Sequence, residues 1–185
     1  ISFQTDAQKN IGAVKTNEGF HLYNSSEPAF TLDLIGAINL SNYPTISING
    51  NLMEFAFGPS ESFGNKDKQI LLNYMKWESD YLTETFEKPI ETHNEFTNTN
   101  GVLVNSWNFI NPGITNENGQ NKKQFYADFR KGENVYRLSF LSFNGSDKNA
   151  EENLLEIINH FHFYSKSIDV AELSKAISNG EIYNN

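Results

Sequence analysis

Four histidines carry the most versatile chemistry in this chain, and two of them are spaced for a shared site. His160 and His162 would lie on one face of a strand, because side chains two residues apart in a strand point the same way. Imidazole nitrogens bind metals such as Zn²⁺, and His21 or His93 could complete a ligand set. The alternative is that alternating polar residues on a terminal strand simply face solvent. We adopt that alternative and expect no metal and no cofactor.

Motifs that position a nucleophile, a catalytic metal or a phosphate are absent from the sequence. It contains no HExxH, no P-loop and no dinucleotide-binding glycine motif. The segment 58–62 lacks the second glycine that a G-x-S-x-G turn requires. The chain has no Cys, which excludes thiol catalysis, disulfides and Cys-based metal sites. We therefore expect a protein that is not an enzyme, and an unrecognised hydrolase is the weakest alternative.

Basic residues gather in one segment of an acidic chain. The chain has 14 basic and 23 acidic residues and a net charge of −9, whereas residues 122–137 hold five basic residues against two acidic ones. Lys122, Lys123, Arg130 and Arg137 are therefore candidate binding residues for an acidic protein partner or an anion. Protection of a sheet edge by Lys and Arg is the structural alternative. The acidic balance and the presence of only two Arg argue against a nucleic-acid binder.

One carboxylate interrupts the apolar face of a predicted helix. On a helical wheel Glu78 falls between Tyr74 and Leu82. Burying an unpaired carboxylate costs several kcal/mol, so it must find hydrogen-bond donors. We expect Glu78 to be mostly buried and bonded to a Tyr, Trp, Lys or backbone group. An acid at a concealed functional site is the alternative.

Hydrophobic periodicity predicts the elements that would position these residues. Apolar positions recur with helical spacing over 66–86 and over 149–161, and Phe161 belongs to the buried face of the second of these helices. A short third helix is predicted between Asp169, as its N-terminal cap, and Gly180, where it ends. Strands are predicted at 19–23, 30–38, 45–48, 52–57, 90–97, 102–110, 124–130 and 135–143, with a polar loop at 112–121.

Turn residues predict how these strands pair. Asn49-Gly50, Asn100-Gly101 and Lys131-Gly132-Glu133 favour tight hairpins, so the strands after Pro89 should form one antiparallel sheet with the two longer helices packed on it. Along 125–130, aromatic and small residues alternate with more polar ones, which indicates a sheet with one covered face.

The domain organisation follows from these elements. Residues 1–18 are polar and aperiodic and should be loosely ordered, 19–164 form a single α+β domain, and 165–185 form a C-terminal helical tail. The chain starts at Ile1, which indicates processing or truncation. No apolar run approaches the roughly 18 residues of a transmembrane helix. The absence of Cys fits a periplasmic or cell-surface location.

Several segments together resemble the PsbP-like and DcrB-like superfamily over about residues 19–164. They are Phe55-Ala56-Phe57-Gly58, the helix 71–82 with Trp77, Trp107-Asn108-Phe109 after Gly101, the segments 125–129 and 132–138, and the helix 154–161 leading into His160–Phe163 as a strand. The resemblance implies a compact α/β/α sandwich. The family includes photosystem extrinsic proteins, periplasmic lipoproteins and adaptor domains, most of them non-catalytic. It has no fixed active site, so no functional residue is transferred.

These observations lead to one function and one rival. We expect a non-catalytic accessory or adaptor protein that binds another protein, as a lipoprotein in a bacterial envelope would. The rival is a protein that binds a sugar, lipid or anion in a cleft beside the sheet. An exposed apolar patch without a deep pocket would favour the first function. A closed pocket with convergent polar groups would favour the second.

Overall fold

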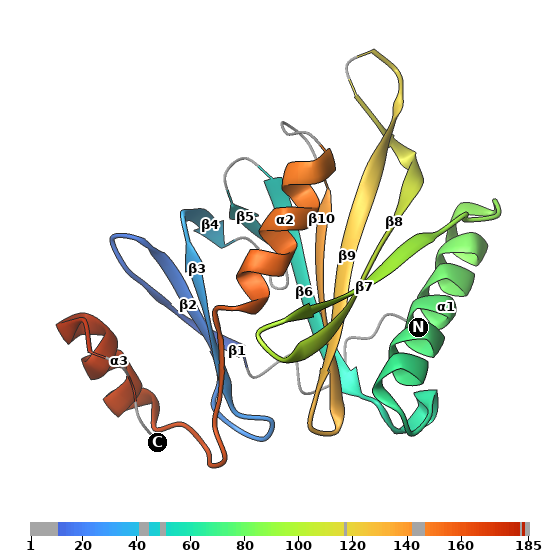
Figure 1. Cartoon of the computed structure of the whole chain (residues 1–185). Coiled ribbons are helices and arrows are strands. Elements are labelled where there is room, and N and C mark those ends of the chain that lie inside the picture. Colours follow the sequence, from blue (N-terminus) through green and yellow to red (C-terminus); the bar gives the residue numbers. More distant parts are fainter. Residues whose placement is uncertain are drawn as a thin grey trace.

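The chain folds into two antiparallel sheets and helices that cover them (Figure 1). The computed structural model describes residues 11–40, 45–48, 51–116, 118–141, 147–181 and 183. The larger sheet has the order β4-β5-β6-β10-β9-β8-β7. Its strands are β4 (Ala37–Leu40), β5 (Thr45–Ile48), β6 (Asn51–Pro59), β7 (His93–Thr99), β8 (Val102–Thr115), β9 (Asn121–Lys131) and β10 (Asn134–Leu141).

The smaller sheet has the order β1-β2-β3-β11. Its strands are β1 (Ile11–Lys15), β2 (Gly19–Asn24), β3 (Phe30–Ile35) and β11 (Phe161–Phe163). The helices are α1 (Asp67–Phe86), α2 (Asp147–Ile158) and α3 (Val170–Asn179), and a short 3-10 helix spans Glu61–Phe63. Within the described ranges, no helix is long and apolar enough to cross a membrane.

The larger sheet is covered on both faces. One face packs against the smaller sheet and α2, and the Phe30 ring from β3 lies 5.7 and 5.4 Å from the rings of Phe55 and Phe57 in β6. The other face packs against α1, where Leu71 and Tyr74 are buried with Val135. The third helix, α3, packs on residues at the end of the smaller sheet through Leu173. Figure 1 shows α1 and α2 on opposite sides of the larger sheet.

The predicted α+β class and the antiparallel pairing after Pro89 are confirmed, because β7–β8, β8–β9 and β9–β10 are all antiparallel pairs. The prediction did not foresee a second sheet. The strand predicted at 30–38 is interrupted by Gly36, whose φ of 77° lies in the left-handed region that glycine tolerates. This break assigns β3 to the smaller sheet and β4 to the larger one.

The expectation that one sheet face would be solvated is wrong. Tyr126 and Asp128 in β9 point away from Phe125 and Phe129, yet all four side chains are buried. The polar face is covered by α1, and Asp128 is compensated there by an ion pair with Arg137. Alternation of polar and apolar residues therefore separates the two faces correctly but does not show which of them is exposed.

The helix boundaries differ from the predictions mainly at α2. The first helix ends at Phe86, followed by Glu87 in the left-handed conformation (φ 53°), two residues before Pro89. The second helix ends at Ile158 rather than at 161, because the amides of Asn159 and His160 close a turn and the chain then becomes extended. Phe161 thus begins β11 instead of ending the helix.

Two segments expected to be irregular contain strand. Ile11–Lys15 pairs with β2 as β1, within the segment 1–18 that we expected to be loosely ordered. The strand β8 continues to Thr115, into the predicted loop 112–121. Both stretches are partly exposed and lack apolar alternation, which is why their sequence does not indicate a strand. The predicted hairpin residues Asn49-Gly50 lie outside the described residues.

Candidate functional site

The short edge strand β11 lies between two clefts. The first, which we call the aromatic cleft, has a volume of about 810 Å³. It opens between the smaller sheet and the β9–β10 turn, and it is lined by side chains that include Phe57, Tyr136, Phe163 and Tyr164. Its remaining lining includes charged residues of both signs, namely Glu27, Lys131, Glu133 and Lys166. Four aromatic side chains with charged neighbours are suited to holding an apolar group that carries a polar end.

Tyr136 lines the aromatic cleft with a hydroxyl group that lacks a partner. The side chain is 0% exposed, and no hydrogen bond to its hydroxyl is found among the described residues. Its ring lies 5.1 Å from that of Phe163 and 5.6 Å from that of Phe57. Burial raises the pKa of this phenol, so the group is neutral. An unpaired buried hydroxyl costs stability and retains an unused capacity to donate or accept a hydrogen bond.

The second cleft, which we call the polar cleft, lies between the outer face of the smaller sheet and α3. Its volume is about 640 Å³. The polar residues that line it include His21, Thr31, Asp33 and His162, and Leu173 and Ile177 of α3 face them. Lys131, Phe163 and Tyr164 border both clefts, so the two meet at β11.

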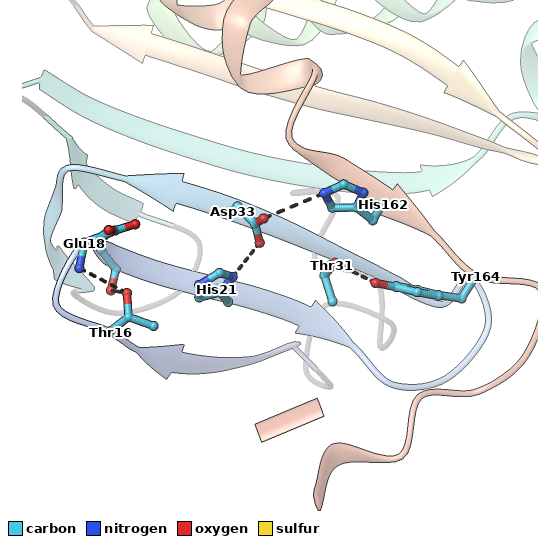
Figure 2. A network of polar contacts seen from close by, with 8 residues as sticks. Thr16, Glu18, His21, Thr31, Asp33, His162 and Tyr164 are labelled. Carbon is cyan, nitrogen blue, oxygen red and sulfur yellow. Dashed lines mark hydrogen bonds and ion pairs between the residues drawn. The ribbon is translucent and has the colours of Figure 1, made fainter. Parts of the chain in front are cut away.

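Alternation along three strands places the polar residues of this cleft side by side (Figure 2). His21 Nδ1 lies 2.5 Å from Asp33 Oδ1, across the β2–β3 pair. His162 Nε2 lies 3.7 Å from the other carboxylate oxygen of Asp33, across the β3–β11 pair. The hydroxyls of Thr31 and Tyr164 are hydrogen-bonded at 3.2 Å. One carboxylate therefore interacts with two imidazoles on one polar face.

The carboxylate changes the protonation of one of these histidines. The hydrogen bond to Asp33 raises the pKa of His21, burial opposes this, and the charges of Asp33 and Glu18 raise it further. The net result is a raised pKa, so His21 holds its proton to higher pH than an isolated imidazole.

The structure does not bring together the histidines that we considered as metal ligands. His160 precedes β11, and its carbonyl accepts a hydrogen bond from the Asp33 amide. β11 begins at Phe161, so the strand expected to hold both histidines does not include His160, and His162 but not His160 lines the polar cleft. His93 lies on β7 in the other sheet. Among the described residues, no group of three or more His, Asp or Glu side chains is arranged to hold a metal ion.

The four predicted basic binding residues do not form one patch. Lys122 and Lys123 lie at one end of β9 and Arg130 at the other, a separation of roughly 25 Å along an extended strand. Arg130 pairs with Asp67 at 2.7 Å. Arg137 is only 6% exposed, so its predicted place in a surface patch is wrong. Binding through Lys122 and Lys123 stays a prediction.

Arg137 is instead the centre of a buried charge cluster beneath α1. Its Nε lies 2.8 Å from Asp128 Oδ1, and its Nη1 lies 2.7 Å from Glu78 Oε2. Burial acts to lower the pKa of Arg137, but Asp128, Tyr74 and Glu78 outweigh it and raise the pKa, so the guanidinium stays charged. Its position, 4.3 Å above the Tyr74 ring, adds a cation–π contact. The cluster is closed to partners and serves the fold.

Glu78 meets one part of its prediction. Its side chain is 16% exposed, which confirms that it is mostly buried. Its partner is Arg137, a residue type that we did not include among the expected donors. The expectation failed because Arg137 had been assigned to the surface of the hairpin.

Sequence reasoning named His21 and His162 as possible metal ligands, but it did not bring them together with Asp33, and it missed Tyr136. Asp33 and His21 are twelve positions apart, and only the register of the β2–β3 pair places them opposite each other. Their polar character at alternate positions of two apolar strands was the available signal. Tyr136 gave no signal, because a tyrosine in an apolar strand is ordinarily a core residue.

Comparison with known proteins identifies relatives in fold only. No protein-family model matches the chain, and no curated protein matches it in sequence. The solution structure of cyanobacterial PsbP (CyanoP) from Synechocystis sp. PCC 6803 is similar, with 8% identity, a TM-score of 0.46 and coverage of 89% of this chain and 97% of that one. A crystal structure from Bacteroides thetaiotaomicron VPI-5482 matches with 13% identity and a TM-score of 0.38. That match covers 92% of this chain but about half, 51%, of the other. A PsbP structure is thus among the solved structures to which this chain is similar.

Proposed function

We propose that this chain is a non-catalytic accessory protein that binds another protein, and that the clefts beside β11 form its contact surface. The observation that carries the proposal is the aromatic cleft of about 810 Å³, which is lined by four aromatic residues, of which Phe163 and Tyr164 are partly exposed. Aromatic residues are enriched at the centres of protein interfaces, where they supply contact area at low entropic cost.

The polar cleft supports the non-catalytic part of the proposal. His21 and Asp33 form a pair that could orient a general base, but such a base needs a nucleophile within hydrogen-bond reach. The nearby Thr31 hydroxyl bonds to Tyr164 instead. Among the described residues, His21 has no hydrogen bond to a hydroxyl, so the assembly lacks the second member of a catalytic pair.

The shape of the clefts favours a macromolecular partner over an enclosed small molecule. Neither cleft is fully enclosed, and the lining of the aromatic cleft carries both signs of charge. The large apolar side chains that are exposed among the described residues do not form an alternative contact surface to the aromatic cleft. They lie on four different elements and are Ile35, Leu52, Ile110 and Val170. An envelope location, periplasmic or at the cell surface, is part of the proposal and is supported by the absence of Cys.

A small-ligand binder is the second candidate, and the Tyr136 hydroxyl favours it. A ligand with a hydrogen-bonding group would satisfy this buried hydroxyl while its apolar part lies against the neighbouring rings. The hydroxyl is covered in the present conformation, so such a ligand would have to displace part of the floor.

Site-specific photo-crosslinking in the native cell tests the main proposal. A photoreactive amino acid replaces Ser165, an exposed residue that lines the aromatic cleft. The matched control places it at Thr85, an exposed hydroxyl residue on α1. We expect a discrete protein adduct from position 165 and none from position 85. Equal adducts from both positions, or none from 165, would contradict the proposal. A small molecule that co-purifies with the chain in native mass spectrometry would favour the second candidate.

A further inference from the structure

The edge of β11 exposes backbone groups that are organised for pairing. His160 accepts a hydrogen bond from the Asp33 amide, and the Tyr164 amide donates to Ala29, so the even-numbered residues of this segment bond to β3. In an antiparallel pair the intervening residues turn their N–H and C=O groups away from that partner. Phe161 and Phe163 therefore direct two donors and two acceptors away from β3, toward the edge of the sheet where no strand of the described residues pairs with β11.

Side chains of β11 alternate between the two sides of the smaller sheet. The rings of Phe161 and Phe163 pack toward the larger sheet, where Phe163 lines the aromatic cleft. His162 points to the opposite side, is 55% exposed and lines the polar cleft. A strand added along β11 would place alternate side chains on these same two sides, because residues directly opposite in a pair share a face.

We propose that β11 binds an extended segment of a partner protein by strand addition, in which main-chain hydrogen bonds form to Phe161 and Phe163. This inference rests on the proposed function and specifies its mode. Residues of the segment opposite the two phenylalanines are apolar and lie on the side of the larger sheet, where Phe163 borders the aromatic cleft, and the residue opposite His162 is polar. This is the mode in which backbone bonds supply affinity and alternating pockets supply specificity.

The positive charge beside β11 indicates that the partner segment carries an acidic residue. The exposed Lys131 borders both clefts, and its ammonium lies 5.6 Å from the centre of the Phe163 ring. An acidic residue in the segment would pair with it at the point where the clefts meet. A second copy of this chain fits less well, because each copy carries a net charge of −9 and the two would repel.

The short length of β11 has an alternative explanation, which is protection of the sheet edge against unwanted pairing. Proteins blunt sheet edges with short strands and lysines, and a three-residue strand beside Lys131 has both features. What protection alone does not explain is the pair of clefts of about 810 and 640 Å³ along the strand. A blunted edge needs no recesses for alternating side chains.

Amide hydrogen exchange and peptide selection test the proposal on the full chain. In the free protein, the amides of Phe161 and Phe163 should exchange rapidly, whereas that of Tyr164, which is bonded to Ala29, should exchange slowly. Short random peptides displayed on phage are selected against the chain, and the selected peptides are then synthesised. We expect apolar residues at alternate positions with an acidic residue nearby. Binding should slow exchange at Phe161 and Phe163 by about tenfold or more, as a hydrogen bond of ordinary strength would.

Charge reversal at the edge supplies a matched control. Lys131→Glu should weaken peptide binding by about fivefold or more, whereas Lys88→Glu, at an exposed lysine after α1, should leave it unchanged. Equal effects of the two substitutions, or slow exchange at Phe161 and Phe163 in the free monomer, would overturn strand addition. Protection that depends on protein concentration would assign the edge to a second copy instead. Peptides that bind in the aromatic cleft without protecting the β11 amides from exchange would overturn strand addition but leave the proposed function standing. Failure to select any peptide that binds either cleft would count against both strand addition and the proposed function.

Discussion

Arg137 and Asp128 face each other across β10 and β9 as a buried ion pair, with 2.8 Å between Arg137 Nε and Asp128 Oδ1. Their side chains lie beneath α1, and Trp107 Nε1 donates to the other carboxylate oxygen at 2.7 Å. Glu78 reaches the same guanidinium from α1. A single arginine therefore connects the helix to the sheet, and its two carboxylate partners come from different elements.

Removing either member of this pair should be strongly destabilising. Asp128→Ala leaves the guanidinium with Glu78 alone, and Arg137→Ala leaves a fully buried carboxylate without its ion pair. We expect each substitution to lower the free energy of unfolding by about 3–5 kcal/mol in urea titrations. The double variant should lose at least about 1 kcal/mol less than the sum of the single losses, because neither charge is then left alone. Strict additivity would show that the two charges are independently stabilised.

Neutralising Glu78 should have a smaller effect. Glu78→Gln keeps the size of the side chain but replaces the ion pair at 2.7 Å from Arg137 Nη1 by a hydrogen bond from the charged guanidinium to a neutral amide oxygen. The expected loss in unfolding free energy is about 1–3 kcal/mol. Glu84→Gln, at an exposed position of the same helix, is the control and should stay within about 0.5 kcal/mol of the wild type. Equal losses for the two variants would mean that the pair contributes nothing.

The His21–Asp33 contact should make stability depend on pH. Because the pKa of His21 is raised in the folded state, mainly by its hydrogen bond to Asp33, the folded chain binds this proton more tightly than the unfolded chain. The stabilisation is fully present below the unfolded pKa of about 6.5 and is lost as the pH rises through the folded pKa. The stability difference between the wild type and His21→Gln should therefore shrink with rising pH. A difference that stays constant or grows as the pH rises would contradict this assignment.

Removing the Tyr136 hydroxyl should stabilise the protein. The hydroxyl is buried without a hydrogen-bond partner, so Tyr136→Phe removes a desolvation penalty and keeps the ring contacts. We expect the free energy of unfolding to rise by about 1 kcal/mol. A loss of stability in chemical denaturation would show that the hydroxyl has a partner in solution. If the cleft binds a small ligand through this group, the same variant should be more stable and yet bind more weakly.

The basic residues of β9 should contribute little to stability. Replacing Lys122, Lys123 and Arg130 together by Gln should leave the melting temperature within a few degrees, because charges that remain partly exposed to solvent contribute about 0–1 kcal/mol each. The contact of Arg130 with Asp67 does not alter this expectation, since the Asp67 side chain is 57% exposed. Weaker binding of an acidic partner or an anion at unchanged stability would support a binding role for Lys122 and Lys123. A collapse of the melting temperature would make the residues structural.

The residues that could be predicted are those governed by local rules. The helical spacing around Ile70 and Tyr74, and Asp169 as the cap of α3 with Gly180 at its end, depend on neighbours within a few positions. The antiparallel pairing of β9 and β10 likewise follows from the turn at Gly132, which adopts a φ of 59°. In these cases the residues that determine the structure lie within or next to the element that they form.

The features that could not be predicted depend on packing between elements that are distant in the sequence. Asp128 and Arg137 have the sequence pattern of a solvated strand face, and only the packing of α1 against that face makes them a buried pair. The same holds for Glu78, whose partner belongs to a strand about 60 residues away.

The sequence by itself determined the α+β class, the extents of α1 and α3, the hairpin from β9 to β10 and the mostly buried state of Glu78, because periodicity, capping and turn residues act locally. Tertiary structure alone decided that there are two sheets, that β11 pairs with β3 and that His21, Asp33 and His162 share one polar face. These features arise from register and packing between distant segments, where burial energy selects one arrangement among many that the local pattern would allow.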